Sequence, residues 1–276
     1  MTISINTNIA SLMAYRGVKS STSALGTNMQ RLASGLKINS AKDDAGGLAV
    51  ATRMMTQIRG LNVVKQNAND GLSLTDVAYA ALDETTNAIQ NIRDLAVEAS
   101  NSTYSSSDRE SLQLNVSEML SEIQRIATAT EYNNLNLLTG SFLNQSFQIG
   151  PNAGDAITVT IDTASLAGLG MGTNGVSVNV STAASASHAI TIADSALDAV
   201  STIRAQLSGI QSRFESIINT AASTADAYAS SVSGIMDTDV ALESAYMAKN
   251  TIIQQAGISV LAQANQQPKI FLKLLE

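Results

Sequence analysis

Few residues in the sequence could support catalysis, and they do not assemble into a recognisable pattern. His188 is the only histidine, and it stands in a Ser/Ala-rich stretch without a neighbouring carboxylate. A lone imidazole of this kind is more often an exposed bystander than a general base or a metal ligand. Cysteine is absent, which excludes thiol chemistry and disulfide bonds. Since no nucleophile, base and oxyanion donor come together, we predict that the protein is not an enzyme and has no catalytic residues.

Two acidic pairs, Asp43-Asp44 and Asp237-x-Asp239, come nearest to a metal site. They lack the ligand spacing of a calcium loop and lie where helix N-termini need capping side chains, so we interpret them as caps. Gly46-Gly47 is not followed by the Lys-Ser/Thr of a phosphate loop, and no G-x-G-x-x-G follows a predicted strand. The sequence therefore predicts neither a bound metal nor a cofactor.

Apolar residues at heptad spacing, in contrast, mark both ends of the chain. Alternating steps of three and four residues keep one narrow seam of a helix facing a partner helix. Each seam is too thin to form a separate globule, so we predict that the two seams pair and then associate with other copies. Periodicity leaves one alternative open, in which both ends fold back as further helices of a bundle. The predicted self-assembly seam consists of Val18, Leu25, Met29, Leu32 and Leu36 near the N-terminus and Leu242, Tyr246, Ile253, Val260 and Ala264 near the C-terminus.

Between the two ends the sequence predicts bundle helices. Breaker and capping residues over 39–47 separate the first helix from the second. A sharp stop is expected at Gly71, and Ser107 or Asp108 is placed to cap the helix that follows the next loop. Pro268 is expected to end the last helix. We predict helices over about 12–37, 48–71, 72–101, 108–130, 191–221 and 237–266.

The middle of the chain changes from helical to strand periodicity. Ile157, Val159 and Ile161 alternate with polar residues after a Gly/Pro/Asn turn over 150–154, which predicts a β-hairpin. No Lys or Arg occurs from Ile126 through Ile203, and Ser, Thr, Gly and Ala dominate. This stretch is too short for a large separate domain, so we expect a small insertion.

Composition supports a thin helical assembly. Aromatic residues make up 4% of the chain and tryptophan is absent, whereas wide globular interiors are filled by large aromatic side chains. The net charge of −7 argues against a nucleic-acid partner, and no apolar run reaches membrane-spanning length. The N-terminus lacks the positive region of a signal peptide, because its first basic residue is Arg16. The residues alone therefore indicate a cytoplasmic protein, or one exported by another route.

Together these patterns predict a mainly α fold: an elongated helical bundle with a terminal coiled coil and a small middle insertion that contains a β-hairpin. We expect residues 1–42 and 237–276 to form the terminal coiled coil. Residues 43–140 and 190–236 are expected to form the bundle, and residues 141–189 a short, β-rich, solvent-facing insertion.

Several segments resemble bacterial flagellins and occur in the order typical of that family. The N-terminal part contains INTN at 5–8, RLASGLKINSAKDDAGGLAV at 31–50, QIRGL at 57–61, NANDG at 67–71 and RDLAV at 93–97. The C-terminal part contains QQAGISVLAQANQQ at 254–267, followed by Pro268. So many separate motifs in one order are very specific for the family.

The resemblance implies a structural, self-assembling subunit of the flagellar filament. In the family, the terminal helices form an inner coiled coil, the next helices form an outer-core bundle, and the middle segment faces solvent. Flagellins are exported unfolded through the flagellar type III channel with an uncleaved signal, so we expect a secreted protein in the extracellular filament. The expected partners are other copies of the chain, an export chaperone, filament cap or junction proteins and other flagellins, without nucleic acid and without membrane insertion.

The chain departs from the family at a face that Toll-like innate immune receptors read in many flagellins. Leu95 matches the family, but Asn91 stands where an arginine is usual and Asn115 where a glutamate is usual. We therefore expect weak recognition by this receptor class. The tail KIFLKLLE also differs from the usual family ending.

Flagellins similar to this chain often carry O-linked glycans in the middle segment. The lysine-free, Ser/Thr-rich run over 173–191 is expected to be an exposed loop. The candidate modification sites are Ser177, Ser181, Thr182, Ser185 and Ser187.

Two other functions remain open from the sequence. A hook–filament junction protein shares the helical ends of flagellins but typically carries a different middle segment. A secreted helical adaptor would have similar helices without forming a polymer.

Overall fold

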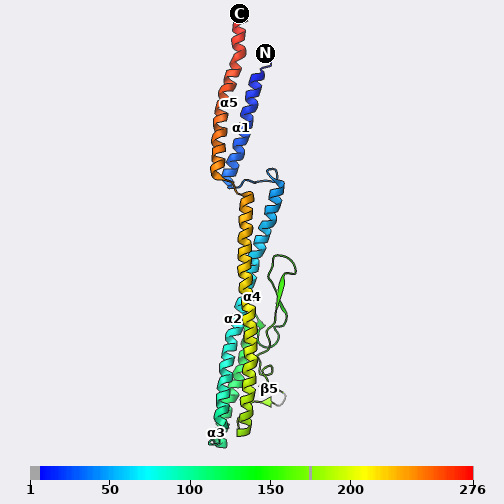
Figure 1. The fold of residues 1–276 in the computed structure, drawn as a ribbon, viewed down its shortest axis with the longest axis vertical. Coiled ribbons are helices and arrows are strands. Elements are labelled where there is room, and N and C mark those ends of the chain that lie inside the picture. Colours follow the sequence, from blue (N-terminus) through cyan, green and yellow to red (C-terminus); the bar gives the residue numbers. More distant parts are fainter. Residues whose placement is uncertain (1–6, 174–175, 276) are drawn as a thin grey trace. The chain divides into compact units, whose positions relative to one another are not determined.

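The computed structural model describes residues 7–173 and 176–275, and these fall into two compact units (Figure 1). One unit combines the described residues up to Ile58 with those from Asp226 onward, and the other spans Arg59–Ala225. Two long helices, α2 (Ala45–Ser100) and α4 (Ala183–Met236), contribute to both units. The predicted fold class, mainly helical with a small hairpin-containing insertion, is confirmed.

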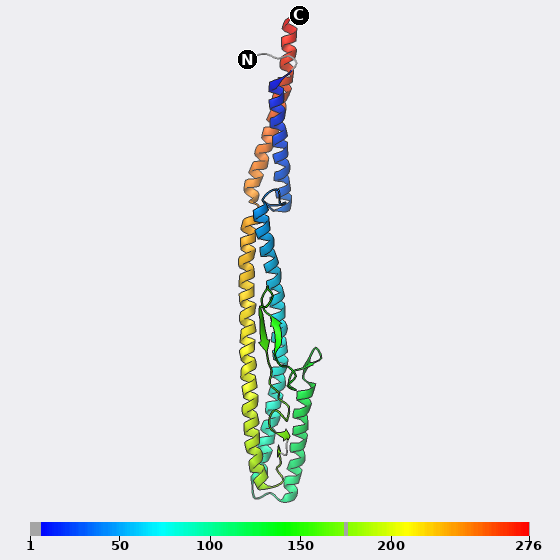
Figure 2. The same cartoon turned by 90° about the vertical axis from the view of Figure 1, so that its right-hand side faces the viewer.

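In the terminal unit, α1 (Ile9–Ser34) and α5 (Val240–Leu275) lie side by side in antiparallel orientation (Figures 1 and 2). The side chain of Asn8 caps α1 by accepting from the Ser11 N–H at 3.1 Å. Gly35 ends the helix with a φ of 70°, a conformation in which glycine is favoured because it has no Cβ. Just beyond, Leu36 and Asp237 form an isolated antiparallel bridge.

Helix α5 continues through Pro268, so the predicted helix end there is wrong. A proline inside a helix supplies no N–H and leaves the carbonyl four residues earlier without its usual donor. That carbonyl belongs to Ala264, and the Asn8 side-chain amide donates to it at 2.6 Å. A side chain from the opposite end of the chain thus replaces the hydrogen bond that the proline removes.

The bundle unit packs α2, α4 and α3 (Ser106–Ala129) around one apolar core. Ser105 and Asp108 form a capping box at the start of α3. The N-cap residue is Ser105, two residues before the predicted candidate Ser107. The predicted stop at Gly71 is wrong, since α2 passes through it without interruption. The largest fully buried side chains of this core include Leu82, Ile89, Ile92, Val116, Ile123, Leu207 and Phe214.

Gly71 is tolerated inside α2 because the ring of Phe214 occupies the space beside it. A Cβ at Gly71 would come within 2.8 Å of Phe214 Cε1 and Cε2. Tertiary packing therefore overrides the local preference of glycine for a helix end.

The insertion contains three two-stranded antiparallel pairs among the described residues: β1 (Glu131–Tyr132) with β2 (Leu135–Asn136), β3 (Gln145–Gln148) with β4 (Ala156–Val159), and β5 (Gly172–Thr173) with β6 (Val176–Ser177). The β3–β4 pair is the predicted hairpin around residues 150–154. The hairpin rests on the bundle, since the rings of Phe147 and Phe214 meet edge to face at 5.5 Å.

Part of the insertion is buried in the bundle core. Ile161, Met171, Val178 and Val180 are at most 1% exposed. The insertion therefore has an inner face that completes the core as well as an outer face. The segment between the helices runs over 130–182, since α3 ends at Ala129 and α4 begins at Ala183.

Candidate self-assembly surface

Asp44 and Asp239 act as helix caps, as interpreted from the sequence, and Asp43 stabilises the turn before α2. Asp44 Oδ1 accepts from the Gly47 N–H at 2.9 Å at the start of α2, and Asp239 Oδ1 accepts from the Ala241 N–H at 2.9 Å at the start of α5. Asp43 accepts from the hydroxyl and backbone N–H of Ser40, and these hydrogen bonds lower the pKa of Asp43. Each such bond satisfies a donor that a helix end or turn would otherwise expose.

Little else in the described ranges is suited to chemistry. No three His, Asp or Glu side chains come together there as metal ligands would, and no helix in them is long and apolar enough to cross a membrane. His188 lies exposed on α4.

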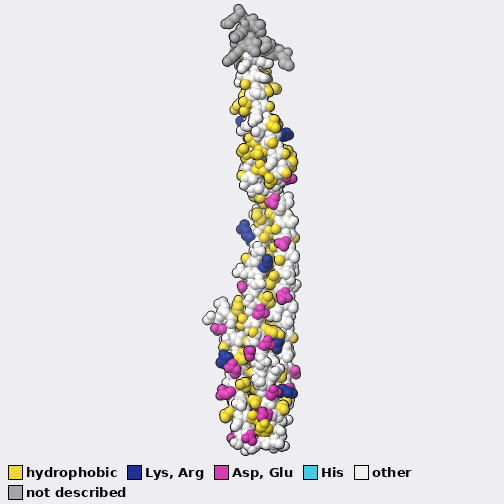
Figure 3. Space-filling view, turned by 90° about the vertical axis from the view of Figure 1, so that its left-hand side faces the viewer, with side chains coloured by type: hydrophobic (Ala, Val, Ile, Leu, Met, Phe, Trp, Pro, Cys, Tyr) yellow, Lys and Arg dark blue, Asp and Glu magenta, His cyan; other side chains and the backbone are white. Residues whose placement is uncertain are grey.

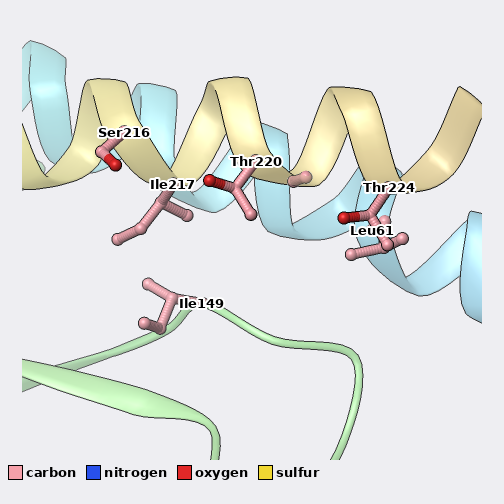
Figure 4. Close-up of a pocket in the computed structure, with 7 residues that line it drawn as sticks. Leu61, Ile149, Ser216, Ile217, Thr220 and Thr224 are labelled. Atoms are coloured by element: carbon pink, nitrogen blue, oxygen red, sulfur yellow. The ribbon is translucent and has the colours of Figure 1, made fainter.

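A small pocket opens beneath the β3–β4 hairpin, where Ile149 faces α4 (Figure 4). Its volume is about 180 Å³. Its walls carry aliphatic groups and three hydroxyls but no titratable side chain, so they offer no acid, base or charged anchor. The lining residues are Leu61, Ile149, Ser216, Ile217, Thr220, Ala221 and Thr224.

The contact between α1 and α5 is a heptad seam made largely of small and polar residues. A Cβ at Gly257 would lie 4.0 Å from the Cβ of Val18, so the two backbones approach closely at this point. Beside it, Gln254 Nε2 donates to Thr22 Oγ1 at 2.8 Å. We call the buried and half-buried facing positions the inner seam: Ser11, Ala14, Val18, Ser21, Leu25, Asn28 and Leu32 on α1, and Glu243, Met247, Asn250, Gln254, Gly257, Leu261 and Ala264 on α5.

The predicted seam residues divide between this inner seam and the surface. On α1, Val18, Leu25 and Leu32 lie in the inner seam, whereas Met29 is 55% exposed. Leu36 lies beyond the end of α1, in the bridge to Asp237. On α5, Ala264 is in the inner seam, but the other four predicted residues are exposed.

Those four residues of α5 form a separate apolar line along one flank of the helix. Leu242, Tyr246, Ile253 and Val260 are 44–52% exposed, and their spacing of four and seven residues keeps them on one side. We call them the outer lane. Each residue of the outer lane is followed in the sequence by a residue of the inner seam. The inner-seam residues of α5 are mostly small or polar, so hydrophobicity alone does not identify the side of α5 that faces α1.

The outer lane belongs to a larger exposed apolar surface of the terminal unit. Hydrophobic side chains gather on the face that α5 presents in Figure 3. A contiguous exposed apolar surface usually marks a protein–protein contact. Further exposed large apolar residues of this unit are Ile9, Leu12, Met13, Tyr15, Met29, Val240, Ile252 and Ile258.

A polar cluster is buried inside the inner seam. Glu243 and Asn28 are 5% and 7% exposed. With the Asn28 amide oriented by its neighbours, its nitrogen donates to Glu243 Oε1 at 3.0 Å and its oxygen accepts from Asn250 Nδ2 at 3.1 Å. Arg31 Nη1 lies 3.8 Å from Glu243 Oε2. The buried Arg31 Nε has no hydrogen-bond partner within the part of the chain that the structure describes.

The residues of the predicted receptor face lie on the bundle unit. Asn91 on α2 and Asn115 on α3 are exposed, whereas Leu95 is half-buried against the core. Asn91 also lines an open groove between α2 and α3, together with Glu122 and Arg125. The hydrogen bond from Arg125 lowers the pKa of Glu122.

The candidate glycosylation sites differ in exposure and in whether their hydroxyls already form hydrogen bonds. Thr182 and Ser185 cap the start of α4 reciprocally, since each hydroxyl accepts from the other residue's N–H at 3.1 Å. Ser181 is half-buried and Ser187 is exposed on the first turns of α4. The side chain of Ser177 lies outside the described part of the chain.

Both ends of the chain match descriptions of one protein family. Residues 5–142 match the bacterial flagellin N-terminal helical region, and residues 190–275 match the bacterial flagellin C-terminal helical region.

Curated relatives and a solved structure agree with this match. The chain is 38% identical to the flagellar filament 33 kDa core protein of Treponema phagedenis, covering 98% of this chain and 99% of that one. It is 38% identical to the flagellar filament core protein flaB2 of Brachyspira hyodysenteriae, covering 99% of each chain. The crystal structure of Bacillus cereus flagellin superposes with a TM-score of 0.51 at 27% identity, covering 56% of this chain and 88% of that one. The chain belongs to the bacterial flagellin family, whose members are structural subunits of the flagellar filament.

Proposed function

We propose that this chain polymerises through α1 and α5 to build the flagellar filament, with further copies of itself as the principal partner. The observation that carries this proposal is the division of α5 into two faces. Its inner seam is closed by α1 of the same chain, while the outer lane is left open.

The outer lane favours repeated association over a closed dimer. A contact between two different surfaces of the same chain generates a helical filament when its rotation does not close into a ring. The line of Leu242, Tyr246, Ile253 and Val260 runs along the helix as a continuous edge. Burying such an edge contributes about 25 cal/mol per Å² of apolar area removed from water.

The finer partners and the route of export are part of the same proposal. Before assembly, α5 would expose both faces if α1 were not yet paired with it, which suits capture by an export chaperone. The absence of cysteine suits passage of an unfolded chain through the flagellar export channel to an extracellular filament.

A hook–filament junction protein and a non-polymerising adaptor are less well supported. The filament proteins of Treponema phagedenis and Brachyspira hyodysenteriae match this chain over nearly its full length, including the middle insertion.

Seeded polymerisation followed by electron microscopy tests the proposal. The wild-type chain should form long fibres, and Ile253→Asp should not, because a carboxylate would be buried between copies. Since Ile253 is 44% exposed in the single chain, the helical content of the monomer should be unchanged. Gln255→Asp, on the same helix and exposed outside the lane, is the matched control and should polymerise. Normal fibres from Ile253→Asp would overturn the assignment of the outer lane.

A further inference from the structure

Apolar packing alone does not define how α1 is aligned along α5. Val18, Leu25 and Leu32 recur every seven residues, and their α5 counterparts Glu243, Asn250, Gly257 and Ala264 recur at the same interval. A slide by one heptad, about 10 Å along the axis, therefore sets each leucine or valine against another residue of the inner seam. Two of the four α5 counterparts, Gly257 and Ala264, are small, and none of the four is a large apolar residue, so no apolar side chain among them singles out one alignment.

The buried polar cluster, in contrast, is compatible with one alignment. Glu243 receives the Asn28 amide at 3.0 Å and faces Arg31 at 3.8 Å. A slide in one direction would set Glu243 against Leu25, and a slide in the other would move it past Ser34, where α1 ends. The first slide would leave a buried carboxylate without its donors, which is strongly unfavourable. The second would remove Glu243 from its hydrogen bond with Asn28.

Other contacts also hold the two helices together at both ends of the pair. At the far end, the Asn8 side-chain amide donates to Ala264 O at 2.6 Å. At the base, Lys37 N donates to Met236 O at 2.6 Å and Thr238 N donates to Gly35 O at 3.0 Å. These are backbone bonds between residues that flank the helices. They oppose a slide at the base of the pair, whereas the polar cluster acts between the buried faces of the two helices themselves.

We propose that Asn28, Glu243 and Asn250 are positioning residues that set the register of α1 against α5. A single buried polar contact is a well-attested means of fixing register in helix pairs. By fixing register, the cluster also decides how the outer lane of α5 lines up with the exposed apolar residues of α1. This last consequence rests on the proposed polymerisation, whereas the register itself is a property of the single chain.

Engineered cysteine pairs can report the register, because the natural chain contains no cysteine. Val18→Cys with Gly257→Cys reports the native alignment, since the two Cβ positions are 4.0 Å apart and disulfides require about 3.5–4.5 Å. Ser11→Cys with Gly257→Cys reports the slide of one heptad that sets Glu243 against Leu25. Oxidation yields are measured for both pairs, in monomers and in seeded fibres.

The cluster is removed with Asn28→Leu and Glu243→Leu together, which takes the buried carboxylate and its amide donor away at the same time. Arg31 loses its ion pair, but its side chain is 30% exposed and can be solvated, so the helices should be preserved. We expect the ratio of native to slid cross-link to fall by at least about tenfold. The exchanged pair Asn28→Glu with Glu243→Asn keeps both groups and should restore the ratio. Thr22→Val with Gln254→Leu removes a more exposed polar contact between the same helices and should leave the ratio unchanged.

An unchanged ratio in the double-leucine variant would overturn the proposal, as would an equal fall in the Thr22/Gln254 control. Neither result depends on whether the unsubstituted chain forms fibres. The register and the polymerisation can therefore fail independently.

Discussion

Phe214 on α4 fills the position that a side chain at residue 71 of α2 would occupy. A Cβ built on Gly71 would meet Phe214 Cε1 and Cε2 at 2.8 Å, closer than van der Waals contact allows. Phe214 itself is fully buried and meets Phe147 of the β3–β4 hairpin edge to face at 5.5 Å. The glycine therefore lets α2, α4 and the hairpin share one packing centre.

Replacing Gly71 with alanine should destabilise the bundle unit. Overpacking a core position typically costs about 1–3 kcal/mol, and this exceeds the gain in helix propensity of about 1 kcal/mol. Urea unfolding of the monomer, followed by circular dichroism, measures the difference. Gly209→Ala is the matched control: a Cβ there would meet nothing within 4 Å, so this variant should be stabilised. Equal stabilisation of both variants would show that Phe214 moves aside at little cost.

Asn8 and Pro268 should be energetically coupled although they stand at opposite ends of the chain. Asn8→Ala removes both the cap of α1 and the donor to Ala264 O, and we expect it to cost about 2 kcal/mol. With Pro268→Ala, residue 268 regains an N–H for that carbonyl, so the same change should cost only about 1 kcal/mol. Critical concentrations of seeded polymerisation for the four chains give the coupling energy. Additive effects would mean that the Asn8 amide does not replace the missing helix bond.

Removing Asp239 to Glu276 should leave a folded, soluble bundle that cannot polymerise. The bundle unit has its own apolar core, whereas the deletion removes α5 with both its inner seam and its outer lane. Sedimentation and electron microscopy after seeding measure assembly, and thermal unfolding checks the bundle. Fibres from the truncated chain would rule out an assembly core built on the terminal helices.

Leu32→Asp should abolish assembly by placing a carboxylate in the inner seam, where Leu32 is half-buried. The expected cost of about 2–4 kcal/mol per subunit corresponds to a roughly thirty- to thousand-fold higher critical concentration. Ala33→Asp, at an exposed position next to it, should assemble nearly normally. Cells that swim with normal-length filaments carrying Leu32→Asp would contradict the prediction.

Activation of a Toll-like receptor by the monomer should be weak and should improve with Asn91→Arg plus Asn115→Glu. Both asparagines are exposed, so the new charges would be available for charge-assisted hydrogen bonds. Two such bonds contribute about 2–4 kcal/mol, or roughly thirty- to thousand-fold in affinity. Reporter-cell dose curves compare both proteins with a control, Gln90→Arg plus Ser117→Glu, which places the same charges at nearby exposed positions. Strong, equal potency of all three would show that these two positions do not control recognition.

Local chemistry in the sequence determined the elements that depend on backbone preference. The Gly/Pro/Asn turn over 150–154 predicted the β3–β4 hairpin, and the acidic pairs predicted caps that Asp44 and Asp239 provide. The heptad of Val18, Leu25 and Leu32 predicted the inward face of α1. Turns, caps and strong apolar periods act over a few residues, so their signal is contained in those residues.

The tertiary structure decided what depends on contacts between distant parts of the chain. Gly71 and Pro268 were expected to end helices, yet Phe214 packs beside Gly71 and Asn8 satisfies the carbonyl that Pro268 leaves free. The sequence likewise does not show which side of α5 faces inward. The inward positions include Glu243, Asn250 and Gly257, none of which is a large apolar residue. Only the position of α1 makes these residues buried and turns Leu242, Tyr246, Ile253 and Val260 outward. A local pattern cannot anticipate a partner that lies more than two hundred residues away in the sequence.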